Sequence, residues 1–332
     1  MQPTPSPQSD TSKNPMTVAS DGSLLRAIEV WRPAADSEQL VCVNGHYDDC
    51  EPFANFSKGA KPDPMISQIT DSGLPMVFSD LAPVMSTRLE GAVEAGVTSA
   101  LGVPTVIGGV VSAVTMMYFS ESAGIVGAIE SWVPDKQRRE LTLGTGHYIN
   151  LGLFEKTSRC IKWPFGAGLP GLTWRTAMPQ LVAGIGRSPA FIRGADAHDS
   201  GLDVGMSFPI FSSVDDIRAI VLLLSSTHSP MAKLFGLWVP DEDGPILKLE
   251  RLCASEGTGA NVTDWQDKLK CEPFEGIAGK AWSSRTPVLE THLADGPEPD
   301  RISEVCSVPL SWGLALPSIV GNRVHAVCTL YG

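Results

Sequence analysis

Apolar segments of strand length recur along the chain in the same order three times. Each round begins with a segment that ends in Trp-x-Pro, namely AIEVWRP, AIESWVP and LFGLWVP, and the tryptophans are 101 and 106 residues apart. A second apolar segment follows each of them: LVCVNGHY, LTLGTGHY and LERLCASEG. Both kinds of segment are predicted to be strands, because turn residues bound them. The recurrence predicts three copies of one unit of about 100 residues.

A glycine-spaced stretch occupies the middle of two copies. In GAGLPGLTWRTAMP, residues 166–179, and EGIAGKAWSSRTP, residues 275–287, two glycines, a tryptophan and a proline keep spacings of 3, 3 and 5. The first copy has PDPMISQITDSGLP there and keeps only its two prolines, eleven residues apart.

This stretch predicts a short helix. Leu169 and Thr173 are four residues apart and fall on one helix face, as Ile277 and Ala281 do in the third copy. Without a Cβ atom, Gly171 and Gly279 would let the helix lie close against the sheet. The prolines that follow stop the helix and start the next strand.

Each copy closes with two apolar segments, and their prolines Pro104, Pro209 and Pro317 are 105 and 108 residues apart. In the first copy, residues 95–120 carry no charge and are long enough to cross a bilayer as a helix. They are rich in Val and Thr and contain a Gly-Gly pair. The equivalent segments of the other copies are interrupted by SSVDD and GNR. We therefore predict a β-hairpin that turns near Gly108, not a membrane helix.

The predicted fold class is α+β, with three tandem domains that each have an antiparallel sheet with short helices on one face. The expected divisions are a disordered tail at residues 1–22, a degenerate first domain at 23–120, a second at 125–226 and a third at 233–332. The connectors are too short for a long signalling helix.

Composition limits the partners. The 332 residues carry a net charge of −12, which argues against binding to nucleic acids or anionic membranes. The seven cysteines are odd in number and form no C-x-x-C, so reduced thiols are expected. The N-terminus has no signal-peptide pattern, and we expect a cytoplasmic protein.

The Gly-x-x-Gly segments with their following proline and strand, GLPGLTWRTAMPQLV and GIAGKAWSSRTPVLE, resemble the GAF domain family. The closing pair of strands is similar to that family as well. The resemblance implies sensory or regulatory modules, which bind small ligands between sheet and helical loops or serve for dimerisation. No kinase, cyclase, phosphodiesterase, ATPase or DNA-binding segment is seen in this sequence.

The repeated tryptophans Trp31, Trp132 and Trp238 are expected in the core. Trp174 and Trp282 lie on the predicted helix, where an aromatic ring could stack on a planar ligand. His46 and His147 end the second strands and could titrate near neutral pH or bind a metal. The candidate ligand-binding residues are His147, Phe165, Trp174, Phe191, Asp196, His198 and Trp282.

Several chemistries lack support in the sequence. No P-loop and no Gly-x-Ser-x-Gly element occurs. The Asp196–His198 cluster could bind a divalent metal, but a solvated loop is favoured, and no catalytic residue or metal site is predicted. Whether a cofactor binds, and which one, is left open by the sequence. Cys271 and Cys306 leave open a thiol enzyme like the free methionine sulfoxide reductases, which share the GAF-like fold.

We therefore expect a non-enzymatic regulatory protein that binds a small ligand or dimerises through its modules, with a protein partner or a second copy as its macromolecular partner. Two alternatives stay open: an interaction scaffold with filled pockets, and a thiol-based redox enzyme. If one copy binds a ligand, the second is favoured because it keeps the glycine pair, Trp174, His147 and a long loop that ends at Asp203.

Overall fold

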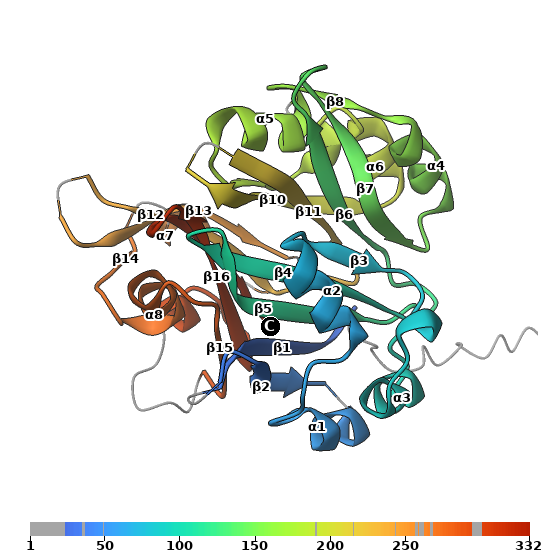
Figure 1. Ribbon diagram of the computed structural model, residues 1–332. Helices are drawn as coiled ribbons and strands as arrows, with labels where there is room; N and C mark the ends of the chain where they lie inside the picture. Colours follow the sequence, from blue (N-terminus) through green and yellow to red (C-terminus); the bar gives the residue numbers. More distant parts are fainter. Residues whose placement is uncertain are drawn as a thin grey trace, which may run out of the picture.

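The computed structural model describes residues 24–34, 37–48, 50–189, 191–214, 216–242, 244–255, 258, 262–265, 268–293 and 301–332. The tail predicted at residues 1–22 lies outside these ranges. The described residues form three antiparallel sheets, and we call the parts of the chain that build them modules 1, 2 and 3 (Figure 1).

The elements follow one order in each module. Module 1 contains β1 (Leu25–Pro33), β2 (Leu40–Tyr47), α1 (Glu51–Ser57), α2 (Pro64–Ser72), β3 (Met76–Phe78), η1 (Ala82–Val84), α3 (Thr87–Glu94), β4 (Ser99–Ile107) and β5 (Val110–Phe119). Module 2 contains β6 (Gly127–Asp135), β7 (Glu140–Ile149), α4 (Gly152–Cys160), β8 (Trp163–Pro164), α5 (Gly168–Thr176), β9 (Gln180–Val182), η2 (Ile185–Arg187), α6 (Gly194–Asp199), β10 (Leu202–Ser213) and β11 (Asp216–Ser226). Module 3 contains β12 (Leu234–Pro240), β13 (Leu247–Ala254), α7 (Val262–Trp265), β14 (Lys270–Cys271), α8 (Gly276–Ser284), β15 (Val288–Thr291), η3 (Arg301–Glu304), β16 (Trp312–Val320) and β17 (Arg323–Tyr331).

Strand order confirms the repeat. The first sheet runs β2-β1-β5-β4-β3, and the other two repeat this order with one short added edge strand each, β8 and β14. In all three modules the pairing of the first two strands is shifted by a β-bulge immediately before the repeated tryptophan. Trp31, Trp132 and Trp238 are buried, as predicted. The α+β class is confirmed, and each module has helices beyond the predicted one, among them a helix after its second strand.

The uncharged segment of the first copy forms the predicted hairpin. β4 and β5 pair antiparallel with one register shift between Thr105 and Val106, and Gly108 and Gly109 make the turn with φ angles of 59° and 85°. Both values lie in the left-handed region that glycine enters without strain. No helix among the described residues has the length and apolar character needed to cross a membrane.

The helix-free faces of the three sheets pack against one another at the centre of the molecule, while the helices lie outside (Figure 1). This common core draws buried residues from every module, for example Val103, Phe208 and Leu316. Strands β4, β10 and β16 contact one another in pairs, and their prolines Pro104, Pro209 and Pro317 line one small cavity of about 20 Å³. The three modules therefore surround a pseudo-threefold axis.

Contacts between modules run in one direction around this axis. The short strand β3 packs on β6 and β7, β9 packs on β12 and β13, and β15 packs on β1 and β2. The amide of Val77 donates to Thr145 Oγ1 across the first of these seams at 3.1 Å. Asn44 Nδ2 donates to the carbonyl of Leu289 across the third at 2.5 Å. Because the third seam joins module 3 back to module 1, the ring is closed.

The second helix glycine makes the close approach expected from its missing Cβ, but the neighbour differs from the prediction. A Cβ atom on Gly279 would lie 2.3 Å from the carbonyl oxygen of Glu272, and one on Gly171 would lie 2.4 Å from that of Pro164. These oxygens belong to the segment that precedes each helix, not to the interior of the sheet.

Gly279→Val should lower the free energy of unfolding by about 1–3 kcal/mol, because backbone must move to admit the side chain. The matched control is Gly152→Val, since a Cβ atom at Gly152 meets nothing within 4 Å. Thermal unfolding followed by circular dichroism measures both variants. A Gly279→Val protein that melts at the same temperature as the control contradicts the prediction.

Candidate functional site

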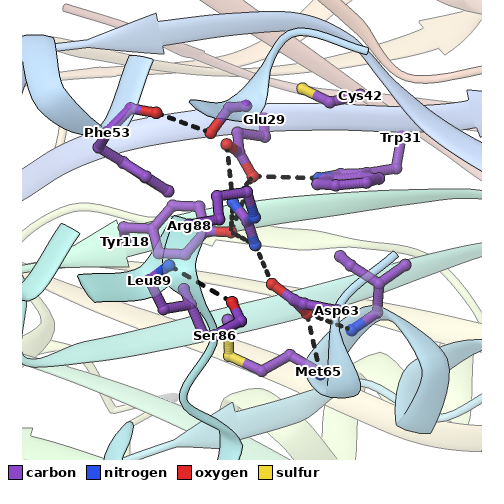
Figure 2. A network of polar contacts seen from close by, with 12 residues as sticks. Glu29, Trp31, Cys42, Phe53, Asp63, Met65, Ser86, Arg88, Leu89 and Tyr118 are labelled. Atoms are coloured by element: carbon purple, nitrogen blue, oxygen red, sulfur yellow. Dashed lines mark hydrogen bonds and ion pairs between the residues drawn. The ribbon is translucent and has the colours of Figure 1, made fainter. Parts of the chain in front are cut away.

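An arginine fills the space between sheet and helices in module 1 (Figure 2). Arg88, on α3, donates through Nη1 to both carboxylate oxygens of Glu29, at 2.9 and 2.8 Å, and through Nη2 to Asp63. Trp31 Nε1 and the hydroxyl of Tyr118 donate to the same Glu29 carboxylate at 3.1 and 2.8 Å. The network therefore satisfies a carboxylate that has no exposure to water.

Local sequence explains how this network forms. Glu29 and Trp31 are two residues apart on β1, so both side chains project from the same face of the sheet toward the helices. Asp63 caps α2 by accepting from the amides of Met65 and Ile66 at 2.9 and 3.1 Å. One carboxylate thus starts a helix and holds the guanidinium of Arg88.

Burial and charge set the protonation states in module 1. Burial alone would lower the pKa of Arg88, but the carboxylates of Glu29 and Asp63 outweigh it, and the pKa is raised. Burial raises the pKa of the Tyr118 hydroxyl well above its usual value, so this group is a neutral donor. The guanidinium also lies 5.1 Å from the Trp31 ring centre and 5.2 Å from that of Phe53.

Module 2 repeats this arrangement. Arg193, at the start of α6, makes two parallel hydrogen bonds to Glu130 at 2.6 and 2.9 Å, and both side chains are almost fully buried. Trp132 Nε1 donates to Glu130 at 2.8 Å. The guanidinium lies 4.4, 5.2 and 5.3 Å from the ring centres of Phe154, Trp163 and Phe191.

Module 3 lacks the buried carboxylate. Gly236 stands two residues before Trp238, where the other modules have glutamate. The indole N–H of Trp238 donates instead to Thr329 Oγ1 at 3.2 Å. Cys271 occupies β14, where module 2 has the large Trp163 in β8. Smaller side chains therefore occupy the space that an ion pair and aromatic rings fill in the other modules.

An open cavity of about 680 Å³ adjoins this part of module 3. Its walls come from β14, the turn before α8 and η3, and they carry Lys270, Glu272, Glu275, Phe274 and Arg301. The carboxylate of Glu275 accepts from the amide of Glu272 at 2.7 Å. Arg301 is exposed, and within the described residues neither Arg301 nor Lys270 takes part in an ion pair.

Only some of the residues that the sequence proposed as ligand contacts lie close to one another in the structure. Phe165 and Trp174 stack edge to face with ring centres 5.0 Å apart and line a second cavity. Phe191 is buried beside Trp163 and belongs to the core of module 2. Trp282 packs partly buried against the core of module 3.

The other three proposed contacts lie apart from these aromatic residues. Asp196 and His198 lie on the short helix α6, and no group of metal-binding side chains occurs among the described residues. His147 Nε2 lies 2.5 Å from Oε1 of Glu121, a residue of the connector between modules 1 and 2. Burial lowers the pKa of His147 despite the opposing effect of this carboxylate.

The two cysteines of interest donate to backbone carbonyls. Cys271 Sγ donates to the carbonyl of Glu275 at 3.2 Å, and Cys306 Sγ donates to that of Val308 at 3.1 Å. Burial raises the pKa of Cys306, which lowers the fraction of reactive thiolate.

Glutamate two residues before the tryptophan was a signal available in AIEVWRP and AIESWVP, because a charge inside an apolar strand needs a buried partner. The two buried arginines left no comparable signal in the sequence. Arg88 is 57 residues after Trp31, and Arg193 is 61 residues after Trp132, within segments that share no motif.

Comparisons with known proteins give weak matches to solved structures. A free methionine-R-sulfoxide reductase from Neisseria meningitidis, in complex with its substrate, is 20% identical over 30% of this chain and 51% of its own, with a TM-score of 0.24. The GAF domain of a phosphoenolpyruvate-protein phosphotransferase from Coxiella burnetii is 21% identical over 29% and 55%, with a TM-score of 0.25. A GAF domain/HD domain protein from Geobacter sulfurreducens is 13% identical over 30% and 62%, with a TM-score of 0.26.

This chain thus spans about half to three fifths of the length of those structures. No family model and no curated protein matches the sequence. The three sheets with their repeated strand order fit three tandem GAF-like domains.

Proposed function

We propose that this chain is a non-enzymatic regulatory protein in which module 3 binds a small ligand and modules 1 and 2 form a rigid frame. The difference in filling between modules supports the proposal. A buried glutamate–arginine pair occupies the interior of modules 1 and 2. Module 3 has Gly236 at the glutamate position and Cys271 at the position of Trp163, and Cys271 lines the open cavity. The favoured ligand site therefore moves from the second copy to the third.

The charges at this cavity favour a ligand with at least one negative group. Lys270 and Arg301 have no ion-pair partner within the described residues, so an anionic group would gain two charge-assisted contacts. Glu272 and Glu275 add two carboxylates to the same walls, which suits a ligand that also carries a positive group. The exposed ring of Phe274 supplies apolar surface.

A thermal-shift screen with amino acids, nucleotides and small carboxylates tests the proposal on the full chain. A ligand at one hundred times its Kd should stabilise the folded state by about 2.7 kcal/mol. Arg301→Gln and Lys270→Gln should each reduce the shift, while Arg187→Gln, an exposed arginine of module 2, should keep it. A shift that survives both cavity variants contradicts the assignment to module 3.

A second candidate is an interaction scaffold, with a protein partner or a second copy of the chain and no small ligand. The closed ring and the two filled modules favour it. Absence of stabilisation by every ligand class would support the scaffold over the ligand-binding function.

A further inference from the structure

A second cavity, of about 270 Å³, lies on the outside of module 2, away from the Glu130–Arg193 pair. Phe165 and Trp174 form one wall, from the loop before α5 and from α5 itself. Phe211, Val214 and Ile217, from the β10–β11 hairpin, also line the cavity. Val214 is 61% exposed, so this apolar site faces water.

The aromatic wall has a geometry suited to a planar ring. The centres of the Phe165 and Trp174 rings are 5.0 Å apart and their planes are at 83°, so the edge of one ring meets the face of the other and the pair forms a corner. The guanidinium of Arg139 lies 4.6 Å from the Phe165 ring centre, and the amide of Phe165 donates to the carbonyl of Arg139 at 2.9 Å. These contacts hold the Phe165 side of the corner in place.

The fold of a module does not require this corner. At the positions equivalent to Phe165 and Trp174, module 3 has Pro273 and Trp282, and Thr70 takes the tryptophan position in module 1. Both modules build the same sheet without the aromatic pair. The Phe165–Trp174 pair of module 2 is therefore not needed to form the fold that the three modules share.

Three cationic side chains lie in the lining of this cavity or against the residues next to it, on a protein of net charge −12. Lys136 lines it and is paired with Asp216, while Arg139 covers the Phe165 ring. Arg175, one residue after Trp174, packs its side chain across Gly166. Within the described residues, Arg139 and Arg175 make no ion pair, and the indole N–H of Trp174 has no acceptor.

We infer that this cavity binds a small aromatic carboxylate of one or two rings. The rings would pack in the corner between Phe165 and Trp174, and the carboxylate would lie toward Lys136 and Arg139. The volume of this cavity is slightly below that of pockets for drug-sized ligands, so it admits no more than two rings. This site is separate from the cavity of module 3, and its test does not depend on that site.

Isothermal titration of the full chain with 2-naphthoate measures the binding, with 2-naphthol as the uncharged analogue. We expect saturable binding at one site, at least tenfold weaker for 2-naphthol. Phe165→Ala and Trp174→Ala should each weaken 2-naphthoate binding at least tenfold, and Arg139→Gln about threefold to tenfold. Trp282→Ala is the matched control, because Trp282 is the equivalent helix tryptophan of module 3.

The variants are checked for folding by their near-ultraviolet circular dichroism before titration. No saturable binding of 2-naphthoate to the wild-type chain up to about 1 mM would overturn the inference. Binding that survives both aromatic substitutions, or that is lost equally in Trp282→Ala, would overturn it as well. Equal affinity for 2-naphthol would remove the carboxylate from the ligand class.

Discussion

Arg193→Met is expected to lower the free energy of unfolding by about 3–5 kcal/mol, the largest loss we predict for a single charge. The substitution leaves the Glu130 carboxylate in an interior where its side chain has no exposure to water. It removes two parallel hydrogen bonds and the packing of the guanidinium against Phe154 and Trp163. Urea unfolding followed by circular dichroism measures the change.

The double variant Glu130→Leu, Arg193→Met is the decisive control. Removing one member of a buried ion pair leaves the other charge buried and unpaired, which costs more than the pair contributes to the fold. Replacing both members with apolar side chains should therefore recover most of the lost stability. A double-mutant cycle that includes Glu130→Leu alone then gives the coupling energy of the pair. Additive losses, with no recovery in the double variant, would show that the two residues act independently and would refute the argument.

Module 3 is a natural version of this replacement. It keeps the buried tryptophan of the first strand, but Gly236 replaces the glutamate and Thr329 accepts the indole N–H. Its sheet has the same strand order as the other two. The module fold therefore does not depend on the ion pair, which supports the expected recovery.

The sequence predicted the repeat and the sheet because both leave periodic local signals. Trp-x-Pro, the glycine pair and the central proline mark equivalent positions about 100 residues apart, and hairpins join neighbours in the chain. The first copy shows that an equivalent element can form even where part of the motif is missing. Without the glycine pair and the tryptophan, the stretch from Pro64 still forms α2, because Asp63 caps it.

The closed ring and the buried arginines were not predictable in this way. A strand that is apolar on both faces, such as β10, shows that both faces are buried but not what covers each face. The second face is covered by the other two modules, through contacts between residues more than one hundred positions apart. Arg88 and Arg193 reach equivalent places from segments of different length, so no spacing connects them.

Phe208→Ala should destabilise all three modules together, by about 3–5 kcal/mol. Phe208 is buried on β10 and lines the small cavity at the pseudo-threefold axis together with Pro104 and Pro317, which belong to modules 1 and 3. Truncation to alanine enlarges a cavity that all three sheets share, and packed neighbours relax only in part.

Because every module buries one sheet face in this common core, we expect a single unfolding transition that shifts as a whole. Hydrogen exchange resolved by peptide should then quicken in β4, β10 and β16 alike. Phe56→Ala, which shortens a phenylalanine that is 53% exposed on α1, is the control and should leave all three rates unchanged. Faster exchange confined to β10, or a second transition that separates module 2 from the others, would mean that the modules unfold independently and that the ring adds little to their stability.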